Sequence, residues 1–195
     1  MSVSDELPRH GDVSRMPISN AEAGGPELDL ERLAGGATGL TPTQGAYMAE
    51  AAAVCLSRKH PPPVTELRVR GDLVGAHALR FRTLTTNAQA AWGDLDDAVE
   101  SGACGVAIVL LLARDKSSTV LRSSKGGGFD FWVGPGPDFQ DAARLEVSGI
   151  LSGPARVEGR VQEKVKQIRR DVSSAAPRWV AVVEFSEPGA KVVRA

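Results

Sequence analysis

The alternation of apolar and polar positions divides the chain into an irregular first fifth and a patterned remainder. Residues 1–40 are mostly Ser, Asp, Glu, Gly and Pro and show little apolar periodicity. Such a segment buries too little surface to offset the entropy lost on ordering. We therefore expect residues 1–40 to be a flexible tail and residues 41–195 to form one globular domain. The alternative for 28–33 is a short helix that docks on the domain or on a partner.

The patterned region begins with a predicted helix. Thr41 stands where an N-cap is expected, a proline follows at the first helical position, and Gln44 completes a capping box. The prolines at 61–63 end the helix. Its apolar stripe is expected to comprise Tyr47, Met48, Ala51, Ala52 and Cys55.

A β-hairpin is predicted next, because residues 64–70 and 78–83 each alternate apolar and polar positions around a Gly-containing turn. The face expected to be buried carries Leu67, Val69, Leu79 and Phe81. The other face is expected to carry Arg68, Arg70, Arg80 and Arg82, beside Glu66. Two interpretations of this face stay open: a solvated surface that discourages edge pairing, or a surface that contacts phosphates.

The second half of the chain predicts a helix, three strands, a helix and a strand. A helix over 94–113 contains Gly102 and Gly105, which indicate close approach of another backbone. Strands are expected at 118–124, 128–134 and 142–150, separated by Gly- and Pro-rich turns. The next helix carries an apolar stripe of Val157, Val161, Val165, Ile168 and Val172. Residues 178–185 read as a strand buried on both faces, and the last residues as a tail or an edge strand.

Two of these strands contain an acid where an apolar residue is expected. In 128–134, alternation places Asp130 on the face of Trp132, and Phe129, Phe131 and Val133 on the other. In 142–150, Leu145 and Val147 share one face, while Arg144, Glu146 and Ser148 share the other. If the strands pair, the two carboxylates converge. Burial of an unpaired carboxylate is costly, so the pattern indicates a metal site, a catalytic site or a salt bridge.

Composition and charge limit the classes of partner, but they do not distinguish a metal site, a catalytic site and a salt bridge. The formal net charge is −1, which argues against a surface built wholly for a polyanion. Residues 1–114 carry ten basic and fourteen acidic side chains, whereas residues 115–195 carry thirteen and ten, so a modest basic bias accompanies the paired acids. That bias would permit attraction to nucleic acid.

Cysteines, histidines and apolar runs indicate a cytoplasmic protein without a membrane span. Cys55 and Cys104 lie in apolar surroundings and are expected to be free buried thiols; a disulfide is the alternative. The three histidines are not spaced as zinc ligands. The longest apolar run, 106–113, is much shorter than a bilayer-spanning helix. No signal-peptide pattern is present at the start.

From Asp94 onward, the order of elements resembles the αβββαβ core of the PD-(D/E)XK, or restriction-endonuclease-like, nuclease superfamily. That family places an aspartate in the second strand after a Gly-rich turn and an (Asp/Glu)-x-Lys in the third; GGGFDFWVG and LEVSG are similar to these motifs. The resemblance implies an α/β (α+β) fold with a central mixed sheet flanked by helices, its core over 94–186. An N-terminal helix and a β-hairpin precede that core.

The resemblance also implies site residues. Asp130 and Glu146 would be catalytic metal-binding carboxylates for Mg²⁺, and Glu100 would match the extra helix acid of some members. The departure is Ser148, which stands in place of the motif lysine and cannot supply its positive charge; it could contact the phosphate or a water. The cation would then come from elsewhere, with candidates Lys125, Lys164, Lys166 and Arg144.

Two classes of function follow. The first is a metal-dependent nuclease that acts on phosphodiester bonds of nucleic acid, in bacterial defence or DNA processing. The second is a catalytically inactive module of the same fold that binds a partner protein, with residues 1–40 as a docking tail. Ser148, the near-neutral charge and the lack of an evident aromatic-rich basic groove favour the second. A small regulatory or antitoxin-like partner within a defence cassette is a variant of it.

Overall fold

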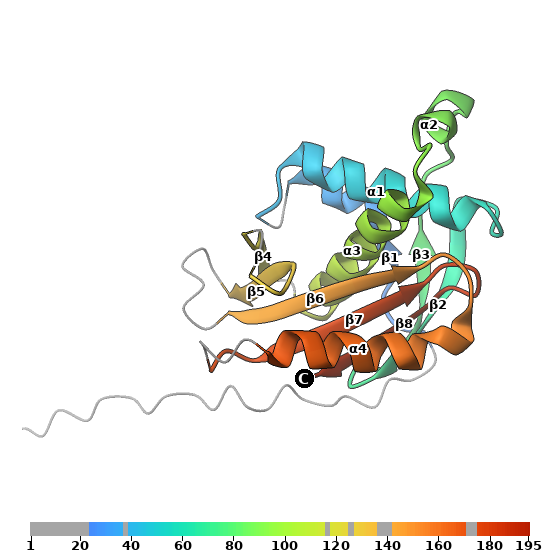
Figure 1. Ribbon diagram of the computed structural model, residues 1–195. Coiled ribbons are helices and arrows are strands. Elements are labelled where there is room, and N and C mark those ends of the chain that lie inside the picture. The colour runs from blue at the N-terminus through green and yellow to red at the C-terminus, as the bar shows by residue number, and fades with distance from the viewer. Residues whose placement is uncertain (1–23, 37–38, 116–117, 125–126, 136–141, 171–174) are drawn as a thin grey trace, which may run out of the picture.

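The computed structural model describes residues 24–36, 39–115, 118–124, 127–135, 142–170 and 175–195, which form one sheet with helices on both faces (Figure 1). The strands are β1 Leu28–Asp29, β2 Val64–Gly71, β3 Gly75–Arg80, β4 Ser118–Arg122, β5 Phe131–Pro135, β6 Ala143–Ile150, β7 Arg178–Glu184 and β8 Gly189–Arg194. The helices are η1 Leu30–Gly35, α1 Pro42–Ser57, α2 Thr86–Ala91, α3 Leu95–Arg114, η2 Pro154–Arg156 and α4 Val157–Arg169.

The sheet is mixed, and its strand order is β1-β3-β2-β8-β7-β6-β5-β4. The pairs β1/β3, β2/β8 and β6/β7 are parallel, and the other neighbours are antiparallel. Because β6 and β7 run parallel, α4 serves as the crossover between them. The predicted α+β fold with a mixed sheet and flanking helices is confirmed, as is the order α3-β4-β5-β6-α4-β7.

The sheet separates two hydrophobic cores. The larger core packs α1, α3 and η1 against one face, where alternate β6 residues Leu145 and Val147 are buried. The smaller core lies under α4 and contains Ile150, Val161, Ile168, Val180 and Val182. Strand alternation therefore directs Glu146, which stands between Leu145 and Val147, toward the face covered by α4. The predicted stripe of α4 is described as far as Ile168, and Val172 lies outside the described residues.

Helices α1 and α3 pack closely because small residues face one another. A Cβ atom on Gly102 would lie 2.8 Å from Ala52 Cα, and one on Gly105 would lie 3.1 Å from the carbonyl oxygen of Met48. The close approach predicted at both glycines is confirmed. Both cysteines lie in these helices as free, buried thiols, as predicted, and burial raises their pKa values.

The flexible tail predicted over residues 1–40 is wrong for residues 24–36, and the alternative of a short helix docked on the domain agrees with η1. Leu28, Leu30 and Leu33 are at most 1% exposed. Leu28 belongs to β1, which pairs with β3, and the other two lie in η1, capped by Asp29 through a 3.0 Å hydrogen bond from the Glu31 N–H. Burial of these three leucines stabilises the ordered form of this segment. Residues 1–23 lie outside the described residues.

The expectation of a tail or edge strand at the C-terminus is also wrong. Strand β8 lies inside the sheet, hydrogen-bonded to β2 on one side and β7 on the other (Figure 1). Its residues alternate, with Ala190 and Val192 buried against the larger core. Single-strand patterning could not reveal this position, because edge and interior strands differ in their partners more than in their own residues.

The capping box and the stripe of α1 are as predicted, except at Tyr47. Thr41 and Gln44 exchange capping hydrogen bonds, and Met48, Ala51, Ala52 and Cys55 are buried. Tyr47 was expected in the core but is 46% exposed. Its ring lies 4.8 Å from that of Trp92 and its hydroxyl donates to Asp97 Oδ2, so its polar end holds it at the rim of the α1–α3 interface.

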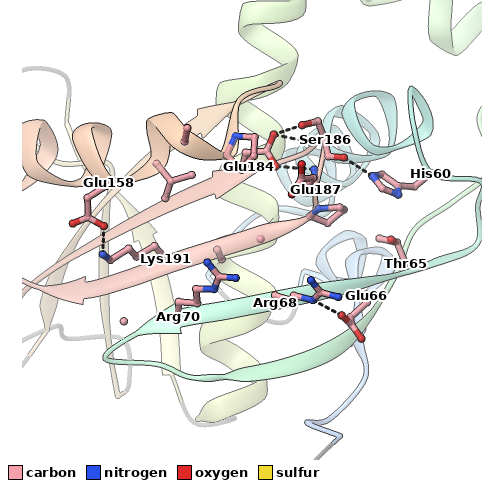
Figure 2. Close-up of a pocket in the computed structure, with 17 residues that line it drawn as sticks. His60, Thr65, Glu66, Arg68, Arg70, Glu158, Glu184, Ser186, Glu187 and Lys191 are labelled. Carbon is pink, nitrogen blue, oxygen red and sulfur yellow. Dashed lines mark hydrogen bonds and ion pairs between the residues drawn. The ribbon is translucent and has the colours of Figure 1, made fainter.

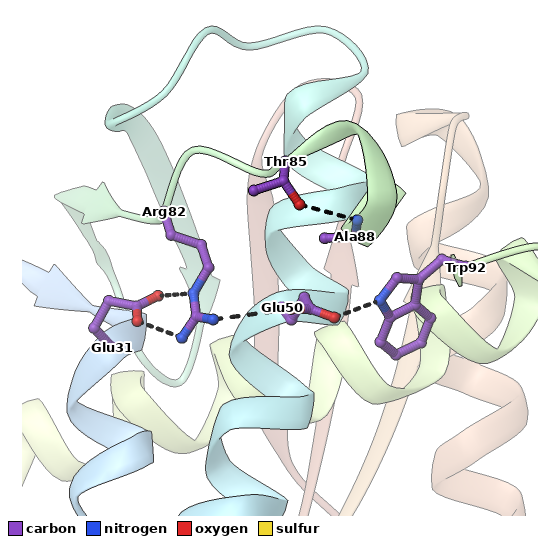
Figure 3. A network of polar contacts seen from close by, with 6 residues as sticks. All are labelled: Glu31, Glu50, Arg82, Thr85, Ala88 and Trp92. Atoms are coloured by element: carbon purple, nitrogen blue, oxygen red, sulfur yellow. Dashed lines mark hydrogen bonds and ion pairs between the residues drawn. The ribbon is translucent and has the colours of Figure 1, made fainter. Parts of the chain in front are cut away.

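The predicted buried face of the hairpin is confirmed, whereas its arginine face is only partly so. Leu67, Val69, Leu79 and Phe81 are each at most 3% exposed. The chain leaves β3 at Arg80, and Arg82 turns instead toward the helices. It binds Glu31 in η1 through two hydrogen bonds and lies 3.9 Å from Glu50 in α1, which also accepts from Trp92 (Figure 3).

Arg68 and Arg80 are paired with carboxylates as well, Arg68 with Glu66 and Arg80 with Glu27. These pairings favour a charge-balanced, solvated face over one that contacts phosphates. Just beyond Arg82, helix α2 was not predicted; Thr85 caps it by accepting from the Ala88 N–H (Figure 3). Among the described residues, no helix combines the length and the apolar character needed to cross a membrane.

Candidate active site

Strand register brings Asp130 and Glu146 opposite each other. Phe131 pairs with Leu145 in the antiparallel β5/β6 ladder, so the next positions outward are Asp130 and Glu146. The Asp130 N–H continues the ladder by donating to the Leu145 carbonyl at 2.9 Å. The sequence expectation that both acids occupy neighbouring strands on one face agrees with this geometry, although Asp130 lies in the bend just before β5.

Asp130 is held by the backbone of β6. Its Oδ2 accepts a hydrogen bond of 2.8 Å from the Val147 N–H. Burial raises the pKa of its carboxyl group; this hydrogen bond and the positive charges of Lys164 and Arg122 oppose the shift without cancelling it. The Val147 N–H, Lys164 and Arg122 therefore favour the charged form of Asp130, but burial outweighs their combined effect.

Glu146 is 3% exposed and is bound from α4. Its Oε1 accepts from Lys164 Nζ at 2.6 Å and from Gln167 Nε2 at 2.9 Å. Lys164 and Gln167 are three residues apart and so share one face of the helix; Lys164 also donates to Gln167 Oε1 at 3.2 Å. Burial raises the pKa of Glu146, and the nearby charge of Asp130 adds to the rise, against the lowering effects of Lys164 and Gln167.

Lys164 is the described lysine that approaches the two carboxylates. Its side chain is 20% exposed. Of the other cations considered, Lys125 lies outside the described residues and Lys166 points to solvent on α4. Arg144 is 4% exposed and contacts aromatic rings instead. A positive charge therefore reaches the site from the helix, in place of the motif position occupied by Ser148.

Ser148 and Glu100 lie further from this arrangement. Ser148 is 8% exposed and follows Glu146 at the next position of β6 that faces α4. Glu100 is exposed on α3, which packs on the opposite face of the sheet. Within the described part of the chain, no three His, Cys, Asp or Glu side chains are grouped so that they could hold a metal. The structure therefore does not gather Glu100 with Asp130 and Glu146.

An aromatic cluster beside the acids escaped the sequence reasoning. Trp132 stands opposite Arg144 in the ladder, and the Arg144 guanidinium lies 5.4 Å from the ring centre of Trp132 and 5.1 Å from that of Phe129. The two rings meet edge to face at 4.7 Å. Alternation assigned Phe129 to the opposite face with Phe131, which is wrong. Gly128 has a φ of +74°, and this left-handed residue interrupts the alternation before β5.

Gln167 was also missed, and its signal was available. It stands three residues after Lys164, so any helix that directs that lysine toward the sheet directs Gln167 there too. The Arg144–Trp132 contact could be found from the sequence only by assuming the ladder register. Counting from an Asp130/Glu146 pair, the next same-face positions are Trp132 and Arg144.

The donor set suits a small divalent cation. Between described residues, the hydrogen bonds of the two acids use Asp130 Oδ2 and Glu146 Oε1, so Oδ1 and Oε2 are the oxygens available for a metal. Mg²⁺ prefers hard oxygen ligands and commonly takes one or two carboxylates with the remaining positions held by water. Asp130 and Glu146, whose charged forms are disfavoured by burial, would suit such an ion.

A separate groove of about 760 Å³ lies between β2, β8 and the start of α4 (Figure 2). Its buried acid, Glu184, accepts from the N–H groups of Gly153, Ser186 and Glu187 and from the Ser186 hydroxyl. Glu184 thus fixes the turn between β7 and β8. Arg68, Arg70 and Lys191 line the groove, and of these Arg68 and Lys191 are paired with Glu66 and Glu158. The groove lacks a convergent set of reactive groups comparable to Asp130 and Glu146.

No family model, no curated protein and no solved structure matches this chain.

Proposed function

We propose that this protein is a Mg²⁺-dependent nuclease that hydrolyses phosphodiester bonds of nucleic acid. The observation that carries the proposal is the convergence of Asp130 and Glu146 from adjacent strands with Lys164 from α4, whose ammonium lies 2.6 Å from Glu146. A half-buried and a buried carboxylate, both with raised pKa values, and one positioned lysine form the kind of perturbed cluster that is common at reactive sites.

The order α3-β4-β5-β6-α4-β7 supports the proposal, because the resemblance to PD-(D/E)XK nucleases rests on the same order. The placement of the acids also supports the proposal, because Asp130 lies just before the second core strand, β5, and Glu146 lies within the third, β6. The main departure from the family motif is Ser148 in place of the lysine. Lys164 on α4 could provide the positive charge that Ser148 cannot.

Each side chain has a defined part in this proposal. Asp130 and Glu146 would hold Mg²⁺ through Oδ1 and Oε2. The ion supplies Lewis acidity toward the phosphate and lowers the pKa of water. Lys164 stabilises negative charge that develops on the phosphate, and Gln167 keeps both Lys164 and Glu146 in place through its two hydrogen bonds. Ser148 lies on the same face and would contact the phosphate or a water.

Cleavage of labelled single-stranded and duplex DNA and RNA in Mg²⁺ or Mn²⁺ tests the proposal. Wild type should cleave at least one of these, and Asp130→Asn and Glu146→Gln should each abolish cleavage while remaining folded. Glu100→Gln is the matched control on α3 and should retain activity. The nuclease proposal fails if wild type leaves every substrate intact, and the assigned site fails if cleavage survives both carboxylate substitutions.

A catalytically inactive module that binds a partner protein is the second candidate. It is favoured by the completeness of the Lys164–Glu146–Gln167 contacts, which would serve equally as a structural ion pair between α4 and the sheet. In that case Glu146→Gln should lower stability without affecting any nucleic-acid chemistry. A partner bound through residues 1–23 would leave the Asp130 region unprotected in a hydrogen-exchange comparison.

A further inference from the structure

A row of side chains crosses the sheet beside the two carboxylates. Leu121 on β4 pairs with Trp132 on β5, which pairs with Arg144 on β6. We call Leu121, Trp132 and Arg144 the aromatic row. It lies two residues along the chain from Asp130 and Glu146, roughly 7 Å. It shares the face of Glu146 because residues two apart in a strand point the same way, while Asp130 lies in the bend just before β5.

The aromatic row is accessible where α4 does not cover it. Leu121 is 45% exposed, and Trp132 and Phe129 are partly exposed. Phe129 meets Trp132 at an interplanar angle of 81°, so these two rings are not stacked face to face. An accessible Trp and Leu side by side at a sheet surface form an apolar platform, and Arg144 beneath it adds a positive charge.

The surroundings of the platform favour an anionic ligand with a flat ring. Arg122 and Lys164 both act electrostatically on Asp130, and Arg144 lies within the row itself. The row therefore lies beside positive charges that a phosphate group could contact. Nucleic acid combines phosphate charge with planar bases, and base–aromatic stacking tolerates any base sequence.

We propose that Trp132 stacks on an unpaired nucleobase next to the scissile phosphate, so that the protein acts on single-stranded nucleic acid. This inference rests on the proposed function for the identity of the reacting bond, but the stacking itself does not need catalysis. A single strand is favoured over a duplex because bases within a duplex already stack on one another, and one of them must be extruded before it can reach Trp132.

Binding without metal tests the inference independently of cleavage. The full chain is titrated in EDTA with a fluorescent oligothymidylate, an abasic strand of equal length and a duplex, with anisotropy as the readout. Wild type should bind the oligothymidylate more tightly than the abasic strand or the duplex. Trp132→Leu, which keeps an apolar side chain, should weaken oligothymidylate binding by about five- to a hundredfold and remove the preference over the abasic strand.

Two further variants make the result specific. Trp132→Phe retains a ring and should keep most of the preference. Trp92→Phe, at the α1–α3 rim, should leave binding unchanged. The inference is overturned if wild type binds abasic strands equally well, if Trp132→Leu behaves as wild type, or if no nucleic acid binds.

The two proposals fail separately. Trp132-dependent binding without any cleavage in Mg²⁺ would remove the hydrolysis and leave the stacking. Cleavage with no dependence on Trp132 would do the reverse, retaining the active site and rejecting single-strand recognition by this row.

Discussion

At the residue scale, the decisive feature is two neighbouring carboxylates whose charged forms are disfavoured by burial. Asp130 has one backbone donor, and Glu146 has a lysine and an amide, yet the pKa of each stays above its ordinary value. Burial is the largest cause of both shifts, and a cation bound between the two acids would favour their ionised forms.

The raised pKa values predict how stability depends on pH in the absence of metal. An acid whose pKa is raised by folding contributes stability that is complete below its unfolded pKa and is lost as the pH rises through its folded pKa. Asp130→Asn removes this loss, and its amide oxygen can still accept from the Val147 N–H. The variant should therefore gain stability relative to wild type as the pH rises above about 4, the ordinary pKa of an aspartic acid, measured by urea unfolding in EDTA. A difference that is independent of pH would contradict this assignment.

Lys164 should matter more than its neighbour on the helix. Lys164→Met removes the ammonium from Glu146 and should reduce cleavage by about a hundredfold or more, the scale of losing one electrostatic stabiliser. Lys166→Met, two residues away and exposed, should remain near wild type. The measurement is the single-turnover cleavage rate, with thermal unfolding as the check on folding. Equal losses in both variants would mean that Lys164 has no special role.

The limits of sequence reasoning are clearest at Phe129 and Tyr47. Strand alternation placed the acids correctly because they lie within or next to the ladder, but Gly128 breaks the alternation and moves Phe129 to the other face. The helical stripe placed Tyr47 inside, although the hydrogen bond of its hydroxyl to Asp97 keeps it at the surface. The first error comes from the local backbone at Gly128, and the second from a contact distant in sequence. Lys164 could be named as the catalytic cation, but its contact with Glu146 could not be derived from the sequence, since that contact depends on how α4 crosses β6.

At the element scale, the site depends on how closely helices approach one another and the sheet. Gly102 admits the backbone of α1 to α3, and a Cβ on Gly149 in β6 would lie 2.3 Å from the Val99 carbonyl oxygen of α3. These contacts seat α3 against one face of β6, while α4 binds Glu146 on the other. Glycines inside a helix and a strand weaken each element locally, but they set the layer spacing on which the site relies.

A matched pair of glycine substitutions tests this account. Gly102→Ala would place a methyl group 2.8 Å from Ala52 Cα and should destabilise the protein by about 1–3 kcal/mol through overpacking. Gly159→Ala in α4 meets nothing within 4 Å and should stabilise it by about 0.5–1 kcal/mol, because alanine favours a helix. Urea unfolding of both variants provides the comparison, and a stabilising Gly102→Ala would show that the helices do not pack this tightly.

Elements with a strong internal pattern were predictable, and elements defined by their partners were not. The capping box of α1 and the hairpin of β2 and β3 can each be recognised from a short stretch of sequence. Strand β1 has two residues, and η1 forms because its leucines meet α1. Neither carries enough local periodicity to distinguish it from a loop, so the ordered segment at 24–36 was assigned to the tail.

At the scale of the whole molecule, β8 joins two sub-sheets into one. The set β1-β3-β2 lies on one side of it and β7-β6-β5-β4 on the other. The acids belong to the second set, whereas η1 and the hairpin belong to the first. The central position of β8 makes the sheet continuous, and α3 packs on this sheet while α1 packs on α3 (Figure 1).

Removal of β8 should therefore unfold the molecule as a whole. A chain that ends at Pro188 loses the ladder to both β2 and β7 and the buried residues Ala190 and Val192. We expect it to lack a cooperative thermal transition by circular dichroism, whereas a chain lacking only Ala195 should retain one. A cooperative transition in the shorter chain would show that the sub-sheets fold without β8.

The central claim is that Asp130 and Glu146 form a divalent-metal site and not only a structural ion pair. Titration with Mn²⁺, followed by electron paramagnetic resonance of the free ion at neutral pH, tests it most directly. Wild type and Glu100→Gln should each bind one ion in this region, and Asp130→Asn and Glu146→Gln should each weaken binding by roughly tenfold or more, because a carboxylate ligand is lost. Absence of binding in wild type, or binding unchanged in both carboxylate variants, would contradict the account.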